Sequence, residues 1–296
     1  MIEYVTRRNL DEQRYNQCIS SSIKSRIYAH SWYLDLVCEQ WGVLVYQNYQ
    51  AVMPLPWNSK LGLKYITQPF FCQQLGIYAK SKLEKTIISE FFTTIPSYFV
   101  KVALATNVSL GTNQFLPLVN YQLALIEDYE IIFQGYRKDR RKSLRKAKEA
   151  GLKHRDFNNK PALISLYKEV FDFVDLPEKS YQTIDKLIDY CIEKEIGFIR
   201  NVFYKDELLC AGFFINYKSR IYYMFGASNL EGKKKGATTY LIDSVIKEFS
   251  NSDFIFDFEG SNDENLARFY KSFGAVNQSY QNLNINRLPS LLRFMK

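Results

Sequence analysis

The stretch that most constrains the fold lies near the C-terminal end of the chain, at residues 253–274. Apolar and acidic residues alternate from Phe254 to Phe258, which is the period-two pattern of a strand. A glycine and a serine then end the pattern, and Asp263 is a candidate N-cap for a helix whose apolar residues share one face. Gly274 follows in the position where a helix commonly ends. The sequence therefore predicts a strand, a short turn and an amphipathic helix.

Two side chains of this stretch could carry chemistry. Glu259 stands at the C-terminal end of the predicted strand, and Tyr270 lies on the apolar face of the predicted helix. Residues at strand ends are common sites of chemistry in α/β folds. The alternative is purely structural: a buried strand packs on the helix, Glu259 is solvated or paired with a lysine, and Tyr270 faces the core.

The composition narrows the class of protein. A chain of 296 residues with 47% hydrophobic residues suits one large domain or two ordinary ones. No apolar run approaches the ~20 residues of a membrane helix, and the N-terminus does not read as a signal peptide. The five cysteines include no C-x-x-C pair and no nearby histidine, which argues against a disulfide framework or a metal site and favours a reducing cytoplasm. Only His30 and His154 could serve a mechanism that needs a histidine base.

Basic residues are concentrated between Arg137 and Lys148, where eight of them accompany one acid, Asp139. The pattern predicts a long charged helix over 128–150 with a thin apolar seam, which would suit a connection between two domains. Such a surface favours an anionic partner: nucleic acid, a phosphorylated small molecule or an acidic membrane. A solvated helix face without a ligand is the alternative.

The rest of the chain is mixed α/β in both halves, and no short repeat is present. The first half is predicted to hold a helical region at 7–30, paired strands at 41–46 and 49–56, a helix at 82–94, and strands at 98–106 and 121–126. The second half is predicted to hold helices at 161–173 and 181–194, strands at 197–204, 208–217 and 220–226, a Gly/Lys-rich loop at 227–238, and a helix at 239–249. These patterns predict two domains, 1–126 and 127–296, with the basic helix linking them. A short amphipathic helix is expected at 286–296. By default it packs on its domain, and contact with a membrane surface is the alternative.

The order of elements in the second half resembles the GNAT acyltransferase fold. The segment Lys233–Thr238 is similar to the pyrophosphate-binding loop of that family, with lysine where arginine or glutamine is usual. Backbone N–H groups at a helix N-terminus, next to cations, would cradle an anion. The segment Asn265–Gly274 is similar to a second GNAT signature, whose tyrosine protonates the leaving group in many members; Ala275 stands where phenylalanine is common.

A wider resemblance is to the FemABX-like acyltransferases, which are tandem GNAT proteins of bacterial cell-wall synthesis. It is carried by the basic helix Arg140–Gly151, by Asp257–Ser261 followed by Phe269–Gly274, and by Ser31-Trp32 after the first helix. The coiled-coil arm of some members and the Pro-Arg-Gly-Pro stretch of typical first domains are absent from the sequence. These departures bear on the peptidoglycan substrate more than on the fold.

The resemblance implies an α/β (α+β) fold of tandem GNAT-like domains, each a mixed sheet flanked by helices. It implies transfer of an acyl or aminoacyl group onto an amine, with acyl-CoA or aminoacyl-tRNA as co-substrate, no tightly bound cofactor and no acyl-enzyme. Glu259 would be the base or amine-orienting carboxylate, Tyr270 the acid, and Lys271 an alternative source of charge stabilisation. Donor phosphates or the tRNA end would be held by Lys233, Lys234, Lys235, Gly236, Ala237, Thr238 and Asn265. Acceptor phosphates or nucleic-acid backbone would be held by Arg140, Arg141, Arg145 and Lys146.

The partners implied are a phosphate-bearing acyl donor and an anionic acceptor, such as a nucleotide-linked or lipid-linked cell-wall precursor, with tRNA as one form of the donor. The expected location is the cytoplasm, with the inner membrane surface as an alternative. A different class of function stays open: a non-catalytic GNAT-shaped module that binds RNA or another phosphate-bearing ligand. A further option is acyl-CoA-dependent N-acetylation of a small amine or a sugar nucleotide.

Overall fold

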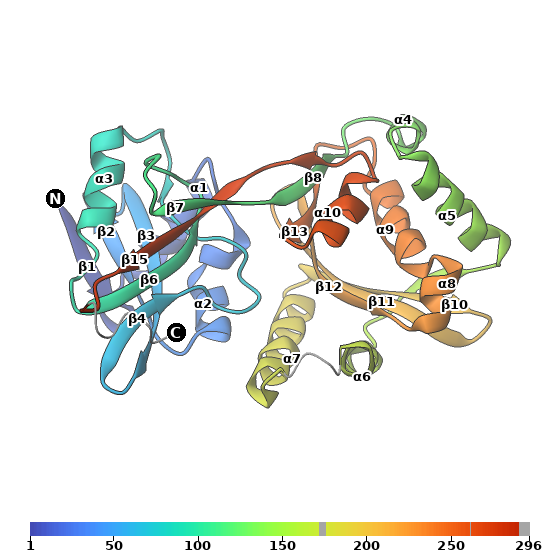
Figure 1. Cartoon of the computed structure of the whole chain (residues 1–296), viewed down its shortest axis with the longest axis horizontal. Helices are drawn as coiled ribbons and strands as arrows, with labels where there is room; N and C mark the ends of the chain where they lie inside the picture. The colour runs from blue at the N-terminus through green and yellow to red at the C-terminus, as the bar shows by residue number, and fades with distance from the viewer. Residues whose placement is uncertain (172–175, 261, 290–296) are drawn as a thin grey trace. The chain divides into compact units, whose positions relative to one another are not determined.

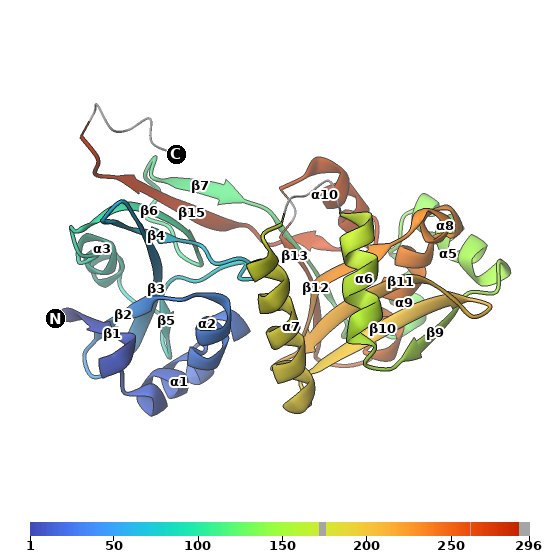
Figure 2. The same cartoon turned by 90° about the horizontal axis from the view of Figure 1, so that it is seen from below.

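The computed structural model describes residues 1–171, 176–260 and 262–289, which fall into two compact units (Figures 1 and 2). Unit 1 comprises Met1–Leu118 and the segment that begins at Ser279, and unit 2 comprises Val119–Gln278. The chain therefore passes between the units twice. This division differs from the predicted one, because the strand at 120–124 lies in unit 2 and the C-terminal strand returns to unit 1.

Unit 1 is a twisted mixed sheet with helices on both faces (Figure 1). The sheet order is β1-β2-β3-β4-β6-β15-β7, and the short β5 also pairs with β3. Its elements are β1 (Ile2–Thr6), η1 (Arg7–Asn9), α1 (Glu12–Ser21), η2 (Ile27–Ala29), α2 (Ser31–Val37), β2 (Trp41–Tyr46), β3 (Ala51–Lys60), β4 (Leu63–Thr67), β5 (Tyr78–Ala79), α3 (Lys85–Thr93), β6 (Phe99–Thr106), β7 (Phe115–Leu118) and β15 (Tyr280–Asn286).

The helical region predicted at 7–30 is broken into two 3-10 turns and one helix. Asp11 caps α1 by accepting a hydrogen bond from the Arg14 N–H at 3.0 Å, and the helix ends at Ser21. The predicted hairpin is confirmed, because β2 and β3 pair antiparallel from Trp41↔Pro56 to Tyr46↔Ala51.

Unit 2 is a second mixed sheet, in the order β14-β8-β13-β12-β11-β10-β9. Helix α9 packs on β10, β11 and β12 from one face, and α6 packs on β11 and β12 from the other (Figure 1). The elements are β8 (Asn120–Ala124), α4 (Tyr129–Gln134), α5 (Lys138–Glu149), β9 (Lys153–Asp156), α6 (Lys160–Val170), α7 (Glu178–Glu193), β10 (Gly197–Tyr204), β11 (Glu207–Asn216), β12 (Arg220–Ser228), α8 (Leu230–Lys235), α9 (Ala237–Glu248), β13 (Ile255–Gly260), α10 (Glu264–Lys271) and β14 (Val276–Asn277).

The two units repeat one order of elements. Apart from η2 and β5 in unit 1 and the short α8 in unit 2, two helices, three antiparallel strands, a helix and a parallel strand follow one another from α1 to β6 and again from α6 to β13. Each unit has one parallel strand pair within an otherwise antiparallel ladder, β4 with β6 and β12 with β13. The repeated order shows one architecture used twice in the chain.

The basic segment is not a linker between the units. It forms two helices, α4 and α5, separated at Gly135, and α5 packs on α9 inside unit 2 through the buried Leu144 and Ala147. After the break, the Arg137 N–H donates to the Ser272 carbonyl at 2.9 Å, which attaches the start of α5 to the end of α10.

Two further sequence predictions concern membrane-spanning helices and the C-terminal helix. None of their helices combines the length and apolarity needed to span a membrane. Of the helix expected at 286–296, residues 290–296 lie outside the described ranges; Asn286 ends β15, and the Arg287 guanidinium donates to the carbonyls of Ile95, Pro96 and Phe99.

Candidate active site

A pocket of about 410 Å³ opens in unit 2 where β12 and β13 separate. The two strands pair at Arg220↔Ile255, Ile221↔Phe256 and Tyr222↔Asp257, and the ladder ends there. We call the pocket beyond that point the β12/β13 cleft. It is lined by Tyr167, Val170, Phe171, Tyr223, Met224, Phe225, Gly226, Ala227, Ser228, Lys233, Thr238, Phe258, Glu259, Gly260, Leu266, Phe269 and Tyr270.

The predicted strand, turn and helix form one wall of this cleft. The Asp263 side chain caps α10 by accepting from the Leu266 N–H at 2.9 Å, and Gly274 has the left-handed φ of +79° expected after a helix. Glu259, on β13, and Tyr270, on α10, both line the cleft. The structure thus brings together the two side chains that the sequence analysis selected.

Glu259 owes its orientation to a β-bulge. The register of β13 with β8 shifts between Asp257 and Gly260, and Glu259 has φ +63°, in the left-handed region. That conformation costs a non-glycine residue roughly 1–2 kcal/mol, so contacts must hold it. The Glu259 N–H donates to the carboxylate of the buried Asp257 at 3.2 Å.

The phenols of the cleft are protonated at neutral pH. Burial, and next the charge of Glu259, raise the pKa of Tyr270 well above its ordinary value, and burial also raises the pKa of Tyr223 strongly. Glu259 and Tyr270 line this same cleft. A protonated phenol can donate a hydrogen bond or a proton, whereas a carboxylate can accept one.

The predicted Gly/Lys loop is mostly helical, which corrects the sequence interpretation. Residues 230–235 form α8, because Asn229 caps it by accepting from the Gly232 N–H at 2.8 Å. Gly236 then adopts φ +77° and begins α9. A β-carbon on Gly236 would lie 2.7 Å from Ser143 Oγ, so this tight junction requires glycine.

Of the residues predicted to hold the donor, Lys233 and Thr238 line the cleft. Lys235 instead lies 4.3 Å from the ring centroid of Tyr204 and pairs with Glu231 at 3.2 Å. The others are placed outside the lining: Lys234 and Asn265 are exposed, Ala237 is buried, and Gly236 shapes the junction. The catalytic candidate Lys271 is also exposed and does not line the cleft.

Helix α5 presents a basic groove, which we define by its lining residues Phe133, Lys138, Arg141, Lys142, Leu144, Arg145, Lys148 and Glu149; its volume is about 610 Å³. Arg141 and Arg145 are exposed, and in the described part of the chain no ion pair involves either of them. Lys146 is exposed but does not line the groove. Of the four cations predicted to contact an anion, Arg141 and Arg145 line the groove, with three lysines beside them.

Arg140 has a different role from the predicted anion contact. Its guanidinium donates to Ser272 Oγ at 2.8 Å and to Thr239 Oγ1 at 2.5 Å, and it lies 4.2 Å from the ring centroid of Phe269. Burial lowers its pKa. Arg140 thus joins α5, α9 and α10 behind the wall of the cleft that Phe269 forms.

In the described part of unit 1, a pocket of about 330 Å³ lies against the corresponding parallel pair, β4 with β6, but the two strands do not separate beyond their ladder. The segment after β4 fills that position: the Gln68 N–H donates to Ala103 O at 3.1 Å, and the Leu75 N–H donates to Ala105 O at 2.8 Å. The Gln68 side chain also accepts from the Ala105 N–H at 3.0 Å. The edge of β6 is therefore occupied by the chain itself, and unit 2 holds the open version of this feature.

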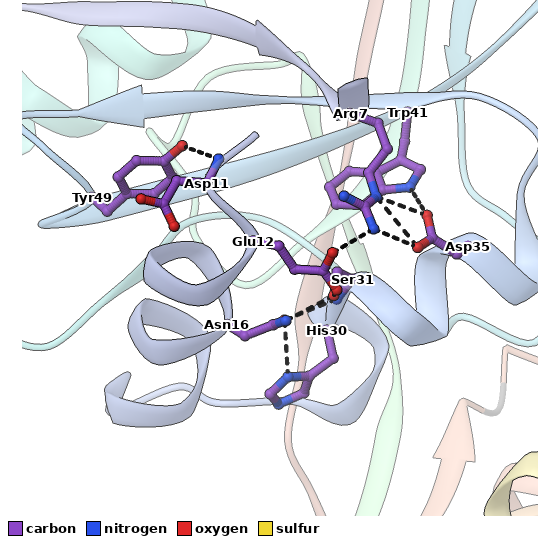
Figure 3. Close-up of polar contacts among 9 residues, drawn as sticks. All are labelled: Arg7, Asp11, Glu12, Asn16, His30, Ser31, Asp35, Trp41 and Tyr49. Carbon is purple, nitrogen blue, oxygen red and sulfur yellow. Dashed lines mark hydrogen bonds and ion pairs between the residues drawn. The ribbon is translucent and has the colours of Figure 1, made fainter. Parts of the chain in front are cut away.

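The polar cluster of unit 1 is centred on Arg7 (Figure 3). Arg7 donates to Asp35 and Glu12, both at 2.8 Å, and Glu12 also accepts from Ser31 Oγ at 2.7 Å. The hydrogen bond that Arg7 donates to Asp35 is the main reason that the pKa of Arg7 is raised. His30, one of the two histidines, contacts Asn16 within this network at 3.3 Å. Two carboxylates face the one guanidinium, so the network joins elements rather than offering an anion site.

The other histidine, His154, does not line the β12/β13 cleft. His154 lies on the edge strand β9, 5.8 Å from the ring centroid of Tyr240, and burial lowers its pKa. Within the described ranges, no three His, Cys, Asp or Glu side chains gather closely enough to hold a metal ion.

Sequence reasoning missed several residues of the site. Asp257 was read only as part of a motif, yet it is fully buried and accepts from Asn120, Gln122 and Arg220. The sequence held one signal for this role: Asp257 lies within an apolar strand pattern, and a carboxylate that is buried in a strand needs hydrogen-bond partners. Tyr223 and Tyr167 gave no signal beyond ordinary apolar periodicity.

Comparisons with known proteins identify the architecture. No protein-family model matches the sequence, and no curated protein matches it. Among solved structures, FemX is similar with a TM-score of 0.65 at 11% identity, covering 99% of each chain. A tandem GNAT protein from the clavulanic acid biosynthesis pathway has a TM-score of 0.54 at 8% identity, covering 98% of this chain and 100% of that chain. The C-terminal domain of a putative lysylphosphatidylglycerol synthetase from Agrobacterium fabrum has a TM-score of 0.55 at 9% identity, covering 93% and 91%. At these identities the likeness establishes the fold.

Proposed function

Because this chain has the FemABX-like tandem GNAT fold, we propose that it is an N-acyltransferase which moves an acyl or aminoacyl group onto an amine in the β12/β13 cleft. The observation that carries the proposal is the meeting of Glu259 and Tyr270 in that one cleft. A carboxylate and a buried, protonated phenol in one cleft can supply both proton transfers of an aminolysis.

The proposed reaction balances without an acyl-enzyme. The amine nitrogen attacks the acyl carbonyl carbon, and Glu259 accepts the proton that the nitrogen loses. The new C–N bond forms as the ester C–O or thioester C–S bond of the donor breaks, and Tyr270 gives its proton to the departing oxygen or sulfur. Glu259 then returns the first proton to the tyrosinate within the cleft, directly or through water.

The donor would lie across the cleft with its phosphates toward Lys233. Thr238 lies in the first turn of α9, where backbone N–H groups have no partner within the helix and favour anions. Acyl-CoA and aminoacyl-tRNA both fit this chemistry. The cationic cradle is smaller than the sequence predicted, because Lys235 is engaged with Tyr204 and Glu231.

The basic groove on α5 would bind the phosphates of a larger partner. Lys138 and Lys148 mark its ends, and ten residues at a rise of 1.5 Å separate them by about 15 Å. At 3.4 Å per charge along one strand, that length matches about four phosphates of a nucleic acid. If the donor is aminoacyl-tRNA, the tRNA backbone would be the ligand of the groove. A phosphate-bearing cell-wall precursor is the alternative ligand.

The test is a transfer assay that offers labelled acetyl-CoA or charged tRNA as donor and a panel of amines, including cell-wall precursors, as acceptors. We expect Glu259→Gln and Tyr270→Phe each to lower kcat by about 10²-fold or more, because proton transfer by a positioned side chain contributes that much. Glu207→Gln and Tyr190→Phe, which lie outside the cleft lining, are matched controls and should leave kcat unchanged. Full turnover in both cleft variants would refute the assignment.

The rival function is a non-catalytic module that binds RNA through the basic groove. It is favoured by Arg141 and Arg145, which are exposed and form no ion pair with any residue that the structure describes. Salt-dependent RNA binding without turnover for any donor and amine would support the rival, whereas amine acylation with the Glu259 and Tyr270 dependence described above would exclude it.

A further inference from the structure

Asp257 is a buried carboxylate with an unusually complete set of donors. Asn120 Nδ2 at 2.9 Å and the Glu259 N–H at 3.2 Å donate to Oδ1, while Gln122 Nε2 and Arg220 Nη1, both at 2.8 Å, donate to Oδ2. The side chain is 0% exposed. Because a buried charge is strongly disfavoured without such partners, the geometry of the whole set is fixed.

The position of Asp257 in the sheet connects it to the cleft. It is the last residue of β13 that pairs with β12, and the bulge that bends β13 begins directly after it. A carboxylate that accepts from the N–H two residues onward closes an Asx turn, which fixes the direction of that residue's N–H and of the peptide bond before it. Here that residue is Glu259.

The hydrogen bond to Asp257 affects where the Glu259 side chain points. In a regular strand, successive side chains alternate between faces, so relaxation of the bulge would move Glu259 relative to Tyr270. We infer that Asp257 is a positioning residue, which holds the Glu259 carboxylate in the β12/β13 cleft through its backbone N–H. This inference rests on the proposed function.

Asp257→Asn is the informative substitution because one amide oxygen replaces two carboxylate oxygens. The charged Arg220 forms the stronger bond and takes that oxygen, so the new NH₂ group faces the Glu259 N–H. We expect kcat to fall about 10-fold or more, with the KM for the acceptor amine changed by less than about threefold. In a crystal structure of the variant, Glu259 should leave the positive-φ region.

A double variant, Asp257→Asn with Arg220→Met, tests for rescue. Without the competing guanidinium, the amide oxygen can accept from the Glu259 N–H, and Gln122 can reverse its amide to accept from the new NH₂ group. We expect a positive φ at Glu259 and a kcat within about threefold of wild type. Asp257→Leu with Arg220→Met lacks the ion pair as well but offers no acceptor, so it should stay slow; this pair decides the question even if Asp257→Asn alone does not fold.

Gln122→Leu is the matched control, because it removes one donor to Asp257 Oδ2 and leaves the contact to Glu259 intact. It should lower the melting temperature yet keep kcat within about twofold. The inference is overturned if Asp257→Asn keeps both a positive φ at Glu259 and wild-type kcat, or if the Asn and Leu double variants are equally slow. If wild type itself transfers no acyl group, the proposed function fails, and the φ of Glu259 across the variants still decides the positioning role.

Discussion

At the scale of single residues, Asp243 is a buried carboxyl outside the proposed chemistry. It lies on α9 with 3% of its surface exposed and accepts from the Tyr129 hydroxyl at 3.0 and 3.1 Å. Burial raises its pKa, and the hydrogen bond from Tyr129 opposes that shift only in part. The folded protein therefore holds the Asp243 proton to a higher pH than the unfolded chain does.

We predict that Asp243 makes stability fall as pH rises. The unfolded carboxyl has a pKa of about 3.9, so the unfavourable contribution is absent below that pH and develops as pH rises through the folded pKa. Asp243→Asn keeps an acceptor for Tyr129 and cannot ionise. Urea unfolding should show that the variant gains stability relative to wild type between pH 4 and pH 8. Asp206→Asn, at a side chain 97% exposed, should show no such trend; the same trend in both variants would contradict the prediction.

Glu259, Tyr270 and Arg140 show how much of the site the sequence could predict. Glu259 and Tyr270 are eleven positions apart on adjoining elements, so local periodicity was enough to place them together. Arg140 was misassigned because its partners, Thr239 and Ser272, are about 100 and 130 positions away. A sequence pattern shows that a cation is present, but only the packing of distant helices shows whether it is free.

At the scale of elements, the junction of α8 and α9 depends on a single glycine conformation. Gly236 has φ +77° and lies against Ser143 of α5. Gly151, which follows α5, has the same φ of +77°, but a β-carbon there would meet nothing within 4 Å. The two positions therefore separate the backbone cost from the steric cost of a side chain.

We expect Gly151→Ala to destabilise the protein by roughly 1–2 kcal/mol, which is the cost of a left-handed alanine. Gly236→Ala should cost at least about 1 kcal/mol more, because the new methyl group overlaps Ser143. Chemical denaturation of unit 2 measures both values. Equal losses would show that α5 moves aside freely at this junction.

The basic groove on α5 gives the second prediction at this scale. Arg145→Glu reverses a charge that lines the groove, whereas Lys146→Glu makes the same change in net charge at the neighbouring position outside it. If the groove binds nucleic-acid phosphates, Arg145→Glu should weaken RNA binding and reduce the slope of log K against log salt by about 0.7. Filter binding or fluorescence titration over a salt series measures this. Equal effects of the two substitutions would indicate a diffuse charge effect and no groove.

Element boundaries could be predicted where the apolar periodicity was strong. The prediction was wrong where a capping side chain determines whether a segment is helical. The strands at 197–204 and 208–217 lie within one residue of their predicted positions. The segment 230–235 was predicted as a loop because of its glycine and lysines, yet the Asn229 cap and packing of the buried Gly232 make it helical. A glycine that is required for close packing looks, in sequence, like a glycine that marks a loop.

At the scale of the whole molecule, β15 explains why the domain boundary could not be predicted. Residues 280–286 pair antiparallel with β6 on one side and β7 on the other, so a strand from the C-terminal end lies inside the sheet of unit 1. Its partners are more than 160 positions away, and its polar, asparagine-rich sequence carries little apolar signal. The preceding strand β14 pairs with β8, so both ends of unit 2 lie on neighbouring strands.

This connectivity predicts different behaviour for two fragments. The fragment 119–278 contains every strand of the unit 2 sheet and should unfold in one cooperative transition. A chain truncated after residue 278 lacks β15, which leaves β7 without its partner and exposes the edge of β6. Its unit 1 should be unfolded while unit 2 remains folded. A chain ending at residue 289 keeps β15 and is the matched control, in which both units should be folded. Near-ultraviolet circular dichroism and amide NMR spectra separate these states, and a folded unit 1 in the chain ending at 278 would show that β15 is dispensable.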